Sequence, residues 1–186
     1  MWKRKILTVM CLLSSGAIAQ VCDTNLPATT PTSNFQVHGD GTVTDKKTGL
    51  MWKQCPEGQT ESGCISGNTS LLTWQAALQV PETINVGGGF AGYTDWRLPN
   101  IKELFSIVEE QCQDPAINLS VFPSRQSQTM WSSSPGESET IDSSTWTGSY
   151  ISAWSVAFYS GGASSYSFQA HSRDEGLAVR LVRNAQ

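Results

Sequence analysis

The sequence holds few of the groups on which enzymes rely for catalysis. Its two histidines, His38 and His171, lie far apart in the chain, and it contains neither a G-x-S-x-G nor an H-E-x-x-H motif. The glycine run 87–89 is not followed by Lys-Ser or Lys-Thr, which excludes a phosphate-binding loop of the P-loop type. We therefore predict no catalytic residue and interpret both histidines as polar surface or loop residues.

Charge is scarce as well. Charged residues make up 15% of the chain, against about a quarter in typical globular proteins. The net charge at pH 7 is −4, and no long basic run is present. Because a negative protein has no general field that attracts nucleic acid or anionic lipid, we expect neither as a partner. Abundant serine, threonine and glycine favour a sheet-rich extracellular domain.

Long apolar runs are absent. The run Ile6–Leu13 is shorter than the roughly 20 residues that cross a bilayer, so we expect no membrane span. Basic residues at 3–5 precede this run and Ala17-Ile18-Ala19 follows it, a pattern typical of a secretory signal peptide over 1–19. Cleavage after Ala19 would change the net charge from −4 to −7. We expect an exported protein, either periplasmic or secreted.

The cysteines fit export. Cys11 lies in the predicted signal peptide, which leaves four cysteines, an even number in an oxidising compartment. Four cysteines allow three pairings. The closeness of Cys55 and Cys64 favours one disulfide between them, and Cys22 would then tie the N-terminal segment to the end of a helix at Cys112. Zinc is a weaker alternative, because the spacings are not paired C-x-x-C and histidines are few.

Turn and cap residues divide the chain after the signal. Residues 20–34, which contain Pro27 and Pro31, predict an extended arm, whereas 35–184 has the length of one domain. Strand-like residues on both sides of the turn 45–49 predict a hairpin. Thr73 caps a predicted helix that carries Trp74, Ala77 and Leu78 on one face and that Pro81 ends or kinks. Asn100 with Glu103 makes an approximate capping box for a second helix.

Beyond Asn118 the pattern changes to strands and turns. Apolar residues alternate in three sets, each of which would place one face on a core: Trp154, Val156 and Phe158; Tyr166, Phe168 and Ala170; Leu177, Val179 and Leu181. The polar segment 135–152 lies before them and is interpreted as an insertion.

Acidic residues form two groupings that could hold a metal. The segment 40–45 faintly resembles a calcium loop but lacks its ligand count and terminal glutamate, so hairpin turn residues are the favoured interpretation. Glu137, Glu139 and Asp142 could chelate, but a solvated loop is favoured. We predict no metal and no cofactor, with calcium at 40–45 as the alternative.

The aromatic residues divide into two groups. Core packing is expected for the tryptophans in apolar patterns, which are Trp52, Trp74, Trp96, Trp131 and Trp154. Stacking on sugars is the candidate role of the aromatics around the insertion, which are Trp146, Tyr150, Tyr159 and Tyr166. Arg97 and Arg180 lie in apolar segments, and if buried they need carboxylate partners, with Asp95, Glu103 or Glu109 as candidates.

Seven blocks carry a family resemblance in a fixed order: Gly39–Asp45, Thr48–Trp52, Gly92–Leu104, Pro115–Asn118, Val121–Pro123, Trp131–Ser134 and Val179–Arg183. They span about residues 35–184 and resemble the Lcl C-terminal domain family, which is grouped with C-type-lectin-like folds. The resemblance implies an α+β domain with a twisted antiparallel sheet, two helices and long loops. Structural roles are expected for the motif residues Trp96, Arg97, Leu98, Pro99, Glu103, Trp131 and Arg180.

The resemblance also implies a binding function. The family's namesake is the C-terminal domain of a collagen-like bacterial adhesin that binds sulfated glycosaminoglycans and trimerises. This chain departs from it in having no collagen stalk, no basic cluster and a longer segment at 135–152. Its Arg97-Leu98-Pro99 block is similar to that of formylglycine-generating enzymes, but their copper-binding cysteine pair has no match near the C-terminus.

These features predict an exported, non-catalytic, adhesin-like binding module for a glycan or a cell-envelope partner. A scaffold or assembly subunit of an extracytoplasmic complex is the first alternative, suggested by the aromatics and the acidic insertion. A carboxylate-based hydrolase using Asp95 or Glu103 is less favoured and would need two carboxylates about 5–10 Å apart in one open cleft. The oligomeric state stays open.

Overall fold

The computed structural model describes residues 20–60, 63–126, 128–143, 146–159 and 168–185, and for 138–143 and 146–150 it describes the backbone alone. The signal peptide expected at 1–19 and the candidate Tyr166 lie outside the described residues. The described chain is α+β, with two helices and several antiparallel sheets rather than one. No helix in this part of the chain is long and apolar enough to cross a membrane.

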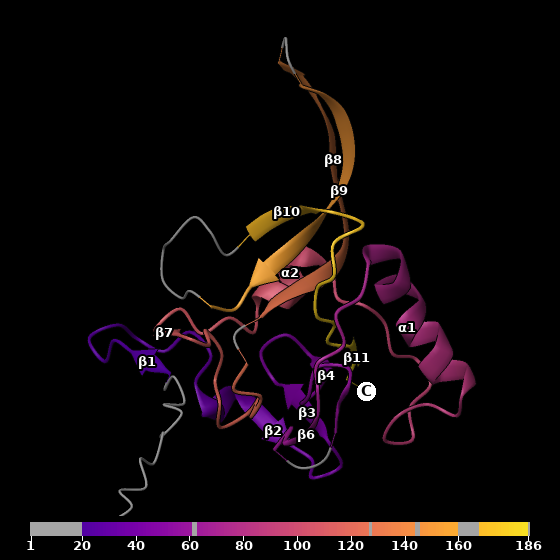
Figure 1. Ribbon diagram of the computed structural model, residues 1–186. Coiled ribbons are helices and arrows are strands. Elements are labelled where there is room, and N and C mark those ends of the chain that lie inside the picture. The colour runs from indigo at the N-terminus through magenta and orange to yellow at the C-terminus, as the bar shows by residue number, and fades with distance from the viewer. Residues whose placement is uncertain (1–19, 61–62, 127, 144–145, 160–167, 186) are drawn as a thin grey trace, which may run out of the picture.

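A four-stranded antiparallel sheet in the order β11-β4-β3-β2 forms the base of the molecule (Figure 1). The carboxylate of Asp45 accepts hydrogen bonds from the Lys47 amide at 2.9 Å and the Thr48 hydroxyl at 2.7 Å, and so closes the turn between β3 and β4. The hairpin predicted around 45–49 is confirmed. The strands of this sheet are β2 Phe35–Val37, β3 Thr42–Asp45, β4 Leu50–Lys53 and β11 Val182–Asn184.

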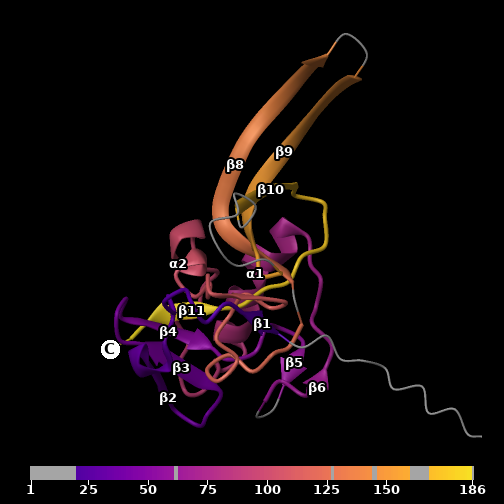
Figure 2. The same cartoon turned by 90° about the vertical axis from the view of Figure 1, so that its left-hand side faces the viewer.

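A three-stranded antiparallel sheet, β8 (Thr129–Ser143), β9 (Trp146–Ala157) and β10 (Phe168–Ser172), contains a long hairpin that projects away from the body (Figures 1 and 2). The insertion predicted at 135–152 is the outer part of this hairpin, so its interpretation as a solvated loop was wrong. β10 pairs with β9 from Ser152 onward, and outside that region the described part of the ribbon is two strands wide. A ribbon without a core beside it needs no apolar face, which explains the polar sequence.

Helix α1 (Trp74–Val86) begins at Thr73, whose hydroxyl accepts a hydrogen bond from the Ala76 amide at 3.3 Å. Pro81 was expected to end or kink the helix; the helix does not end there and continues for five residues beyond it. Pro81 is buried, so packing of the helix on the body compensates for the missing backbone hydrogen bond. Leu78 is 38% exposed and does not share the buried face of Ala77.

Helix α2 (Ile101–Phe105) begins with the predicted capping box, but it is short. The chain leaves the helix well before Cys112, which lies in strand β7 rather than at a helix end as expected. Capping therefore predicted where α2 starts, and the apolar spacing up to Val108 overestimated its length. The other short elements are β1 (Val21–Cys22), η1 (Thr32–Asn34), β5 (Gln59–Thr60), β6 (Ser66–Gly67) and β7 (Cys112–Gln113).

Two buried clusters hold these layers together. The first contains Trp52, Leu104 and Phe122 and lies among the base sheet, α2 and the inner part of the hairpin. The second contains Trp96 and Trp131 and has α1 packed against it. The prediction that the tryptophans pack in the core is thus confirmed for Trp52, Trp96 and Trp131. Trp74 is half-buried.

Some apolar residues of the alternating sets do not reach the core. Trp154 is 36% exposed, because Ala153 and Ser155 occupy the buried face at this position in β9. Phe168 is 43% exposed, since β10 is the edge strand of its sheet, and it stacks on Phe105 with ring centroids 4.4 Å apart. From 178 to 183 every residue is buried, so the alternation expected there is absent.

The N-terminal arm is fastened to the domain. Disulfides join Cys22 to Cys112 and Cys55 to Cys64, the pairs favoured by the spacing. The Glu109 carboxylate accepts five hydrogen bonds, from the amides and hydroxyls of Thr29 and Thr30 and from the Gln111 amide. Burial would raise the pKa of Glu109, but these hydrogen bonds outweigh it and hold the pKa below its usual value.

We expect Glu109→Gln to lower the free energy of unfolding by about 2–3 kcal/mol at pH 7, because an amide group would oppose some of these donors. A carboxylate with a lowered pKa stabilises the fold above the unfolded-state pKa and loses this contribution as pH falls through the folded-state pKa. The wild type should therefore lose stability below about pH 4.5, and Glu109→Gln should lose less. Urea unfolding between pH 3 and pH 7 measures both, with Glu110→Gln as control; an unchanged pH slope in Glu109→Gln would contradict this role.

Candidate functional site

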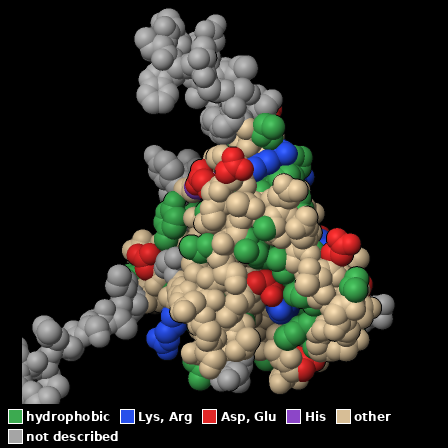
Figure 3. All heavy atoms as spheres, turned by 45° about the vertical axis from the view of Figure 1, so that its right-hand side comes forward, with side chains coloured by type: hydrophobic (Ala, Val, Ile, Leu, Met, Phe, Trp, Pro, Cys, Tyr) green, Lys and Arg blue, Asp and Glu red, His purple; other side chains and the backbone are tan. Residues whose placement is uncertain are grey.

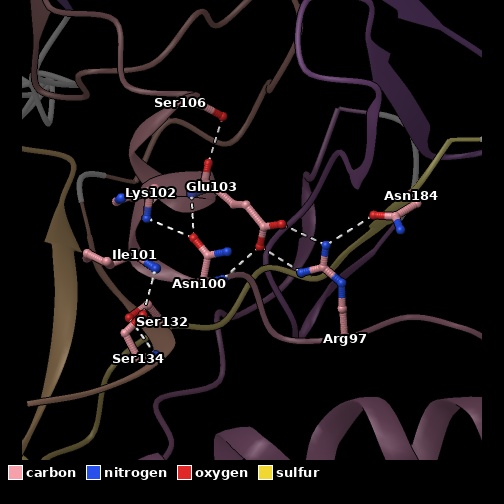
Figure 4. A network of polar contacts seen from close by, with 9 residues as sticks. All are labelled: Arg97, Asn100, Ile101, Lys102, Glu103, Ser106, Ser132, Ser134 and Asn184. Carbon is pink, nitrogen blue, oxygen red and sulfur yellow. Dashed lines mark hydrogen bonds and ion pairs between the residues drawn. The ribbon is translucent and has the colours of Figure 1, made fainter.

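The block 95–104 forms a polar network at the start of α2 (Figure 4). Asn100 Oδ1 accepts from the Lys102 and Glu103 amides at 3.0 and 2.9 Å, and Glu103 accepts in return from the Asn100 amide at 2.9 Å. Arg97 donates to both oxygens of Glu103, each at 2.7 Å. Its backbone also pairs with Val182, so the network links α2 to the base sheet. These contacts support a structural role for the block.

The charges of this network are satisfied within it. Burial would raise the pKa of Glu103, but hydrogen bonds from Arg97 and the Asn100 amide hold the pKa lower than usual. Hydrogen bonding to Glu103 raises the pKa of Arg97 further. Asp95 is held by Arg183, whose hydrogen bonds lower its pKa. A general acid needs a pKa near the working pH. Asp95 and Glu103 do not match this requirement, because each is paired with an arginine and has a lowered pKa.

The buried arginines differ from expectation. Arg180 is 1% exposed and has no carboxylate in contact among the described residues. It donates to the carbonyls of Lys53 and Gln54 and lies 4.9 Å over the ring of Phe122. Burial lowers the pKa of Arg180 to about 9, and the negative charge of Glu57 partly opposes this. The carbonyls of Lys53 and Gln54 thus take the place of the carboxylate that was expected beside Arg180. Glu109, one of the candidate partners, binds the N-terminal arm instead.

The proposed sugar-stacking aromatics are not gathered into one described site. Tyr159 is 39% exposed, and its hydroxyl accepts a hydrogen bond from Gln169. Trp146 and Tyr150 lie on β9 where the backbone alone is described, and Tyr166 lies outside the described residues. Their role as a binding surface stays a prediction.

The acidic groupings have other partners or cannot be followed. Asp40 Oδ1 accepts from the amide and hydroxyl of Thr42, as expected of a hairpin turn residue. Burial would raise the pKa of Asp40, but the hydrogen bonds from Thr42 keep it below the ordinary value. Glu137 is exposed on β8, and the side chains of Glu139 and Asp142 lie outside the described part. Within the described residues, no three acidic, histidine or cysteine side chains cluster as metal ligands would.

A cleft of about 710 Å³ lies beside the loop closed by Cys55–Cys64. We call it the disulfide-loop cleft. It lies between the ends of β2 and β4, the β5–β6 ribbon and the loop before Trp96, and its principal lining residues are Val37, Lys53, Cys55, Glu57, Gln59 and Phe90. Gly58 and Gly67 let the two strands of the ribbon cross closely, since a side chain on Gly67 would meet the Gly58 carbonyl at 2.2 Å.

The cleft combines an aromatic wall with fixed polar groups. The Lys53 ammonium lies 4.3 Å over the ring of Phe90 and 2.7 Å from the Glu57 carboxylate, and both charged side chains are about 14% exposed. Gln59 is 8% exposed, and its Oε1 has no hydrogen-bond partner among the described residues. A buried acceptor without a donor is costly to the fold. Concave sites of this size and mixed polarity are typical of small-ligand binding.

Sequence reasoning missed this cleft. Its residues come from segments between 37 and 123 that only the fold brings together. Two local signals were available: the Cys55–Cys64 spacing, which predicted a closed polar loop, and Gly58 and Gly67 at its base. Neither signal indicated that Gln59 would be buried.

Comparison with protein families gives a match over most of this domain. Residues 41–183 match the family model described as the Lcl C-terminal domain, which is more than half of the chain. The matched region contains the network of α2 and the buried arginines. It also contains all but three residues of the cleft lining, because Val37, Gly39 and Asp40 lie just before it. A comparison with curated proteins gave no match.

Proposed function

The chain belongs to the Lcl C-terminal domain family, and from this premise we propose that it is an exported, non-catalytic binding module. Its ligand site is the disulfide-loop cleft, and its ligand is a glycan or another hydroxyl-rich component of the cell envelope. The fold is a lectin-like variant in which the loop closed by Cys55–Cys64 forms one wall of the site. Residues 1–19 direct export, and the two disulfides fit an oxidising compartment.

One observation carries the choice of ligand. Gln59 lines the cleft and its Oε1 is a buried acceptor without a donor, and in this proposal a sugar hydroxyl reaches the atom as the ligand binds and supplies the donor. The ring of Phe90 and the side chain of Val37 offer apolar surface to the C–H face of a sugar ring. The charges of Lys53 and Glu57 neutralise each other, so the cleft does not select for a polyanion.

The decisive variant is Gln59→Leu. Because Oε1 has no partner in the free protein, an apolar side chain of similar size should leave the melting temperature unchanged or raise it. A ligand that donates to Oε1 should bind at least about tenfold more weakly, since its hydroxyl would be left unpaired. Gln113→Leu, an exposed strand substitution outside the cleft, is the matched control.

The ligand is sought on a glycan array and in a pull-down from a cell-envelope fraction with the processed protein, each with and without calcium. We expect a hit that is independent of calcium, since Asp40 and Asp45 are engaged in their own turns. Calorimetry then compares the wild type with both variants. Absence of binding to every glycan and fraction, or equal binding by Gln59→Leu, would overturn the proposal.

A role as an assembly subunit is the second candidate. It is favoured by the outer part of the β8–β9 hairpin, whose two edges pair with no further strand among the described residues. Exposed strand edges are sites at which a second chain can add. Light scattering separates the two roles, because assembly through this ribbon requires an oligomer and cleft binding does not.

A further inference from the structure

A second pocket of about 530 Å³ lies at the foot of the projecting hairpin, away from the disulfide-loop cleft. It is formed by the start of α1, by β9 and by the turn after β10. Its principal lining residues are Trp74, Leu78, Ile151, Ser172, Arg173 and Asp174. Basic, acidic and hydrophobic side chains meet at the top of the described surface in Figure 3.

Arg173 is held rigidly in this pocket. Its Nε donates to the Ser152 carbonyl at 2.9 Å, and its guanidinium carbon lies 4.2 Å from the centre of the Trp74 ring. Its backbone is fixed as well, because its amide donates to Ile151 and its carbonyl accepts from the Trp74 amide. The indole of Trp74 is in turn fixed by a 2.8 Å hydrogen bond to the Ser132 carbonyl.

The outer edge of the Arg173 guanidinium is unoccupied. Neither terminal nitrogen, Nη1 or Nη2, has a hydrogen-bond or ion-pair partner among the described residues, whereas Arg97, Arg180 and Arg183 each use at least one. Stacking and the Nε hydrogen bond have already fixed the side chain, so a ligand would bind it with little further loss of conformational entropy. Two parallel N–H groups match the two oxygens of a carboxylate.

The side chains around Arg173 determine which chemical group next to the carboxylate fits the pocket. Leu78 and Ile151, which are 38% and 55% exposed, offer apolar surface beside the guanidinium. Glu175 does not compete for Arg173, because its two oxygens bind His171 and the Ser172 amide at 2.7 and 3.1 Å. Asp174 adds one negative charge to the lining, and the first turn of α1 at the same pocket contains no acidic residue.

From this arrangement we infer that the pocket binds a carboxylate with an aliphatic group next to it, namely the C-terminus of a peptide ending in an aliphatic residue. Arg173 binds the carboxylate by two hydrogen bonds, and Leu78 and Ile151 pack against the terminal side chain. This inference does not rest on the proposed function, since the two sites share no lining residue.

The test is a calorimetric titration of the processed full chain with N-acetyl-leucyl-leucine and with its C-terminal amide. We expect the acid to bind at least about tenfold more tightly than the amide, which cannot accept two N–H groups. Arg173→Lys keeps the charge and should weaken binding of the acid at least about tenfold, because it loses the planar pair of donors. Asp174→Asn removes a negative charge that repels the ligand carboxylate, so this variant should bind the acid more strongly.

Arg125→Lys, on an exposed loop residue, is the matched control and should bind like the wild type. Leu78→Ser separates the apolar contribution: it should weaken binding, and its cost in melting temperature should be small because Leu78 is partly exposed. No binding of the acid, equal binding of acid and amide, or an unchanged affinity in a folded Arg173→Lys would overturn the inference. Binding of glucuronate but not of the peptide acid would overturn the peptide assignment.

Discussion

Substitution of both Cys22 and Cys112 by serine is expected to lower the free energy of unfolding by about 4–5 kcal/mol. The disulfide closes a loop with a sequence separation of 90 residues, so its removal frees a large part of the unfolded chain. In the chain-entropy model the stabilisation grows with the logarithm of the loop length. The loss is comparable to a large fraction of the total stability of a typical domain.

The matched control is the double serine variant of Cys55 and Cys64, whose loop has a separation of nine residues. The same model gives it about 2.5–3 kcal/mol. Guanidinium unfolding of the two variants and the wild type measures both differences. A smaller loss for the long loop than for the short one would contradict the entropic account and would assign the stability of the arm to Glu109 and its hydrogen bonds.

Trp131→Ala is the second large expected effect, with a loss of about 3–5 kcal/mol. Trp131 is fully buried in the second cluster, where its indole donates to the Leu72 carbonyl at 2.7 Å and meets the ring of His171 edge to face. Alanine would leave a cavity between α1 and the hairpin and would remove the indole hydrogen bond to the Leu72 carbonyl, which keeps the one from the Leu177 amide at 3.0 Å. Thermal unfolding followed by calorimetry measures the loss.

Two controls separate burial from hydrogen bonding. Trp131→Phe keeps most of the volume and loses the hydrogen bond, so about 1–3 kcal/mol is expected. Trp154→Ala removes the same type of side chain from a site that is 36% exposed, and its cost should be clearly smaller than that of Trp131→Ala. Equal losses at Trp131 and Trp154 would contradict the assignment of Trp131 to the core.

Local chemistry predicted the local structure well. The turn after Asp45 and the cap at Asn100 depend on hydrogen bonds between residues three apart or closer, and such contacts can be recognised in a sequence. The closeness of Cys55 and Cys64 favoured one of the three possible pairings, and the structure contains that pairing, with Cys22–Cys112 as its second disulfide. The seven family blocks predicted that distant segments of the chain belong to one domain, and the family match over residues 41–183 agrees with this.

The errors arise where tertiary contacts decide. Pro81 remains inside α1 because the helix packs on the body, which no propensity expresses. Alternation failed for Trp154 and Phe168 since it assumes one buried and one exposed face, whereas β9 is buried on both faces near its end and β10 is an edge. The polar hairpin at 135–152 had no apolar pattern at all, and therefore resembled a loop.

The candidate sites were harder to predict than the fold. Arg173 and Trp74 are 99 residues apart in sequence and meet through the hairpin and α1. Gln59 gives no sign of burial in a segment of polar residues. In both pockets the informative feature is a polar atom without a partner, and that can be recognised when the structure is known.

The central claim is that the disulfide-loop cleft binds the ligand, and filling the cleft tests it most directly. Thr60 is an exposed strand residue of the cleft lining, so Thr60→Trp should fill the cleft without disturbing the core; Gln113→Trp places the same side chain on an exposed strand elsewhere. Calorimetric titration of both folded variants with the ligand found on the array is the measurement. We predict that Thr60→Trp loses at least about tenfold in affinity and that Gln113→Trp binds like the wild type. Unchanged binding by Thr60→Trp would contradict the claim.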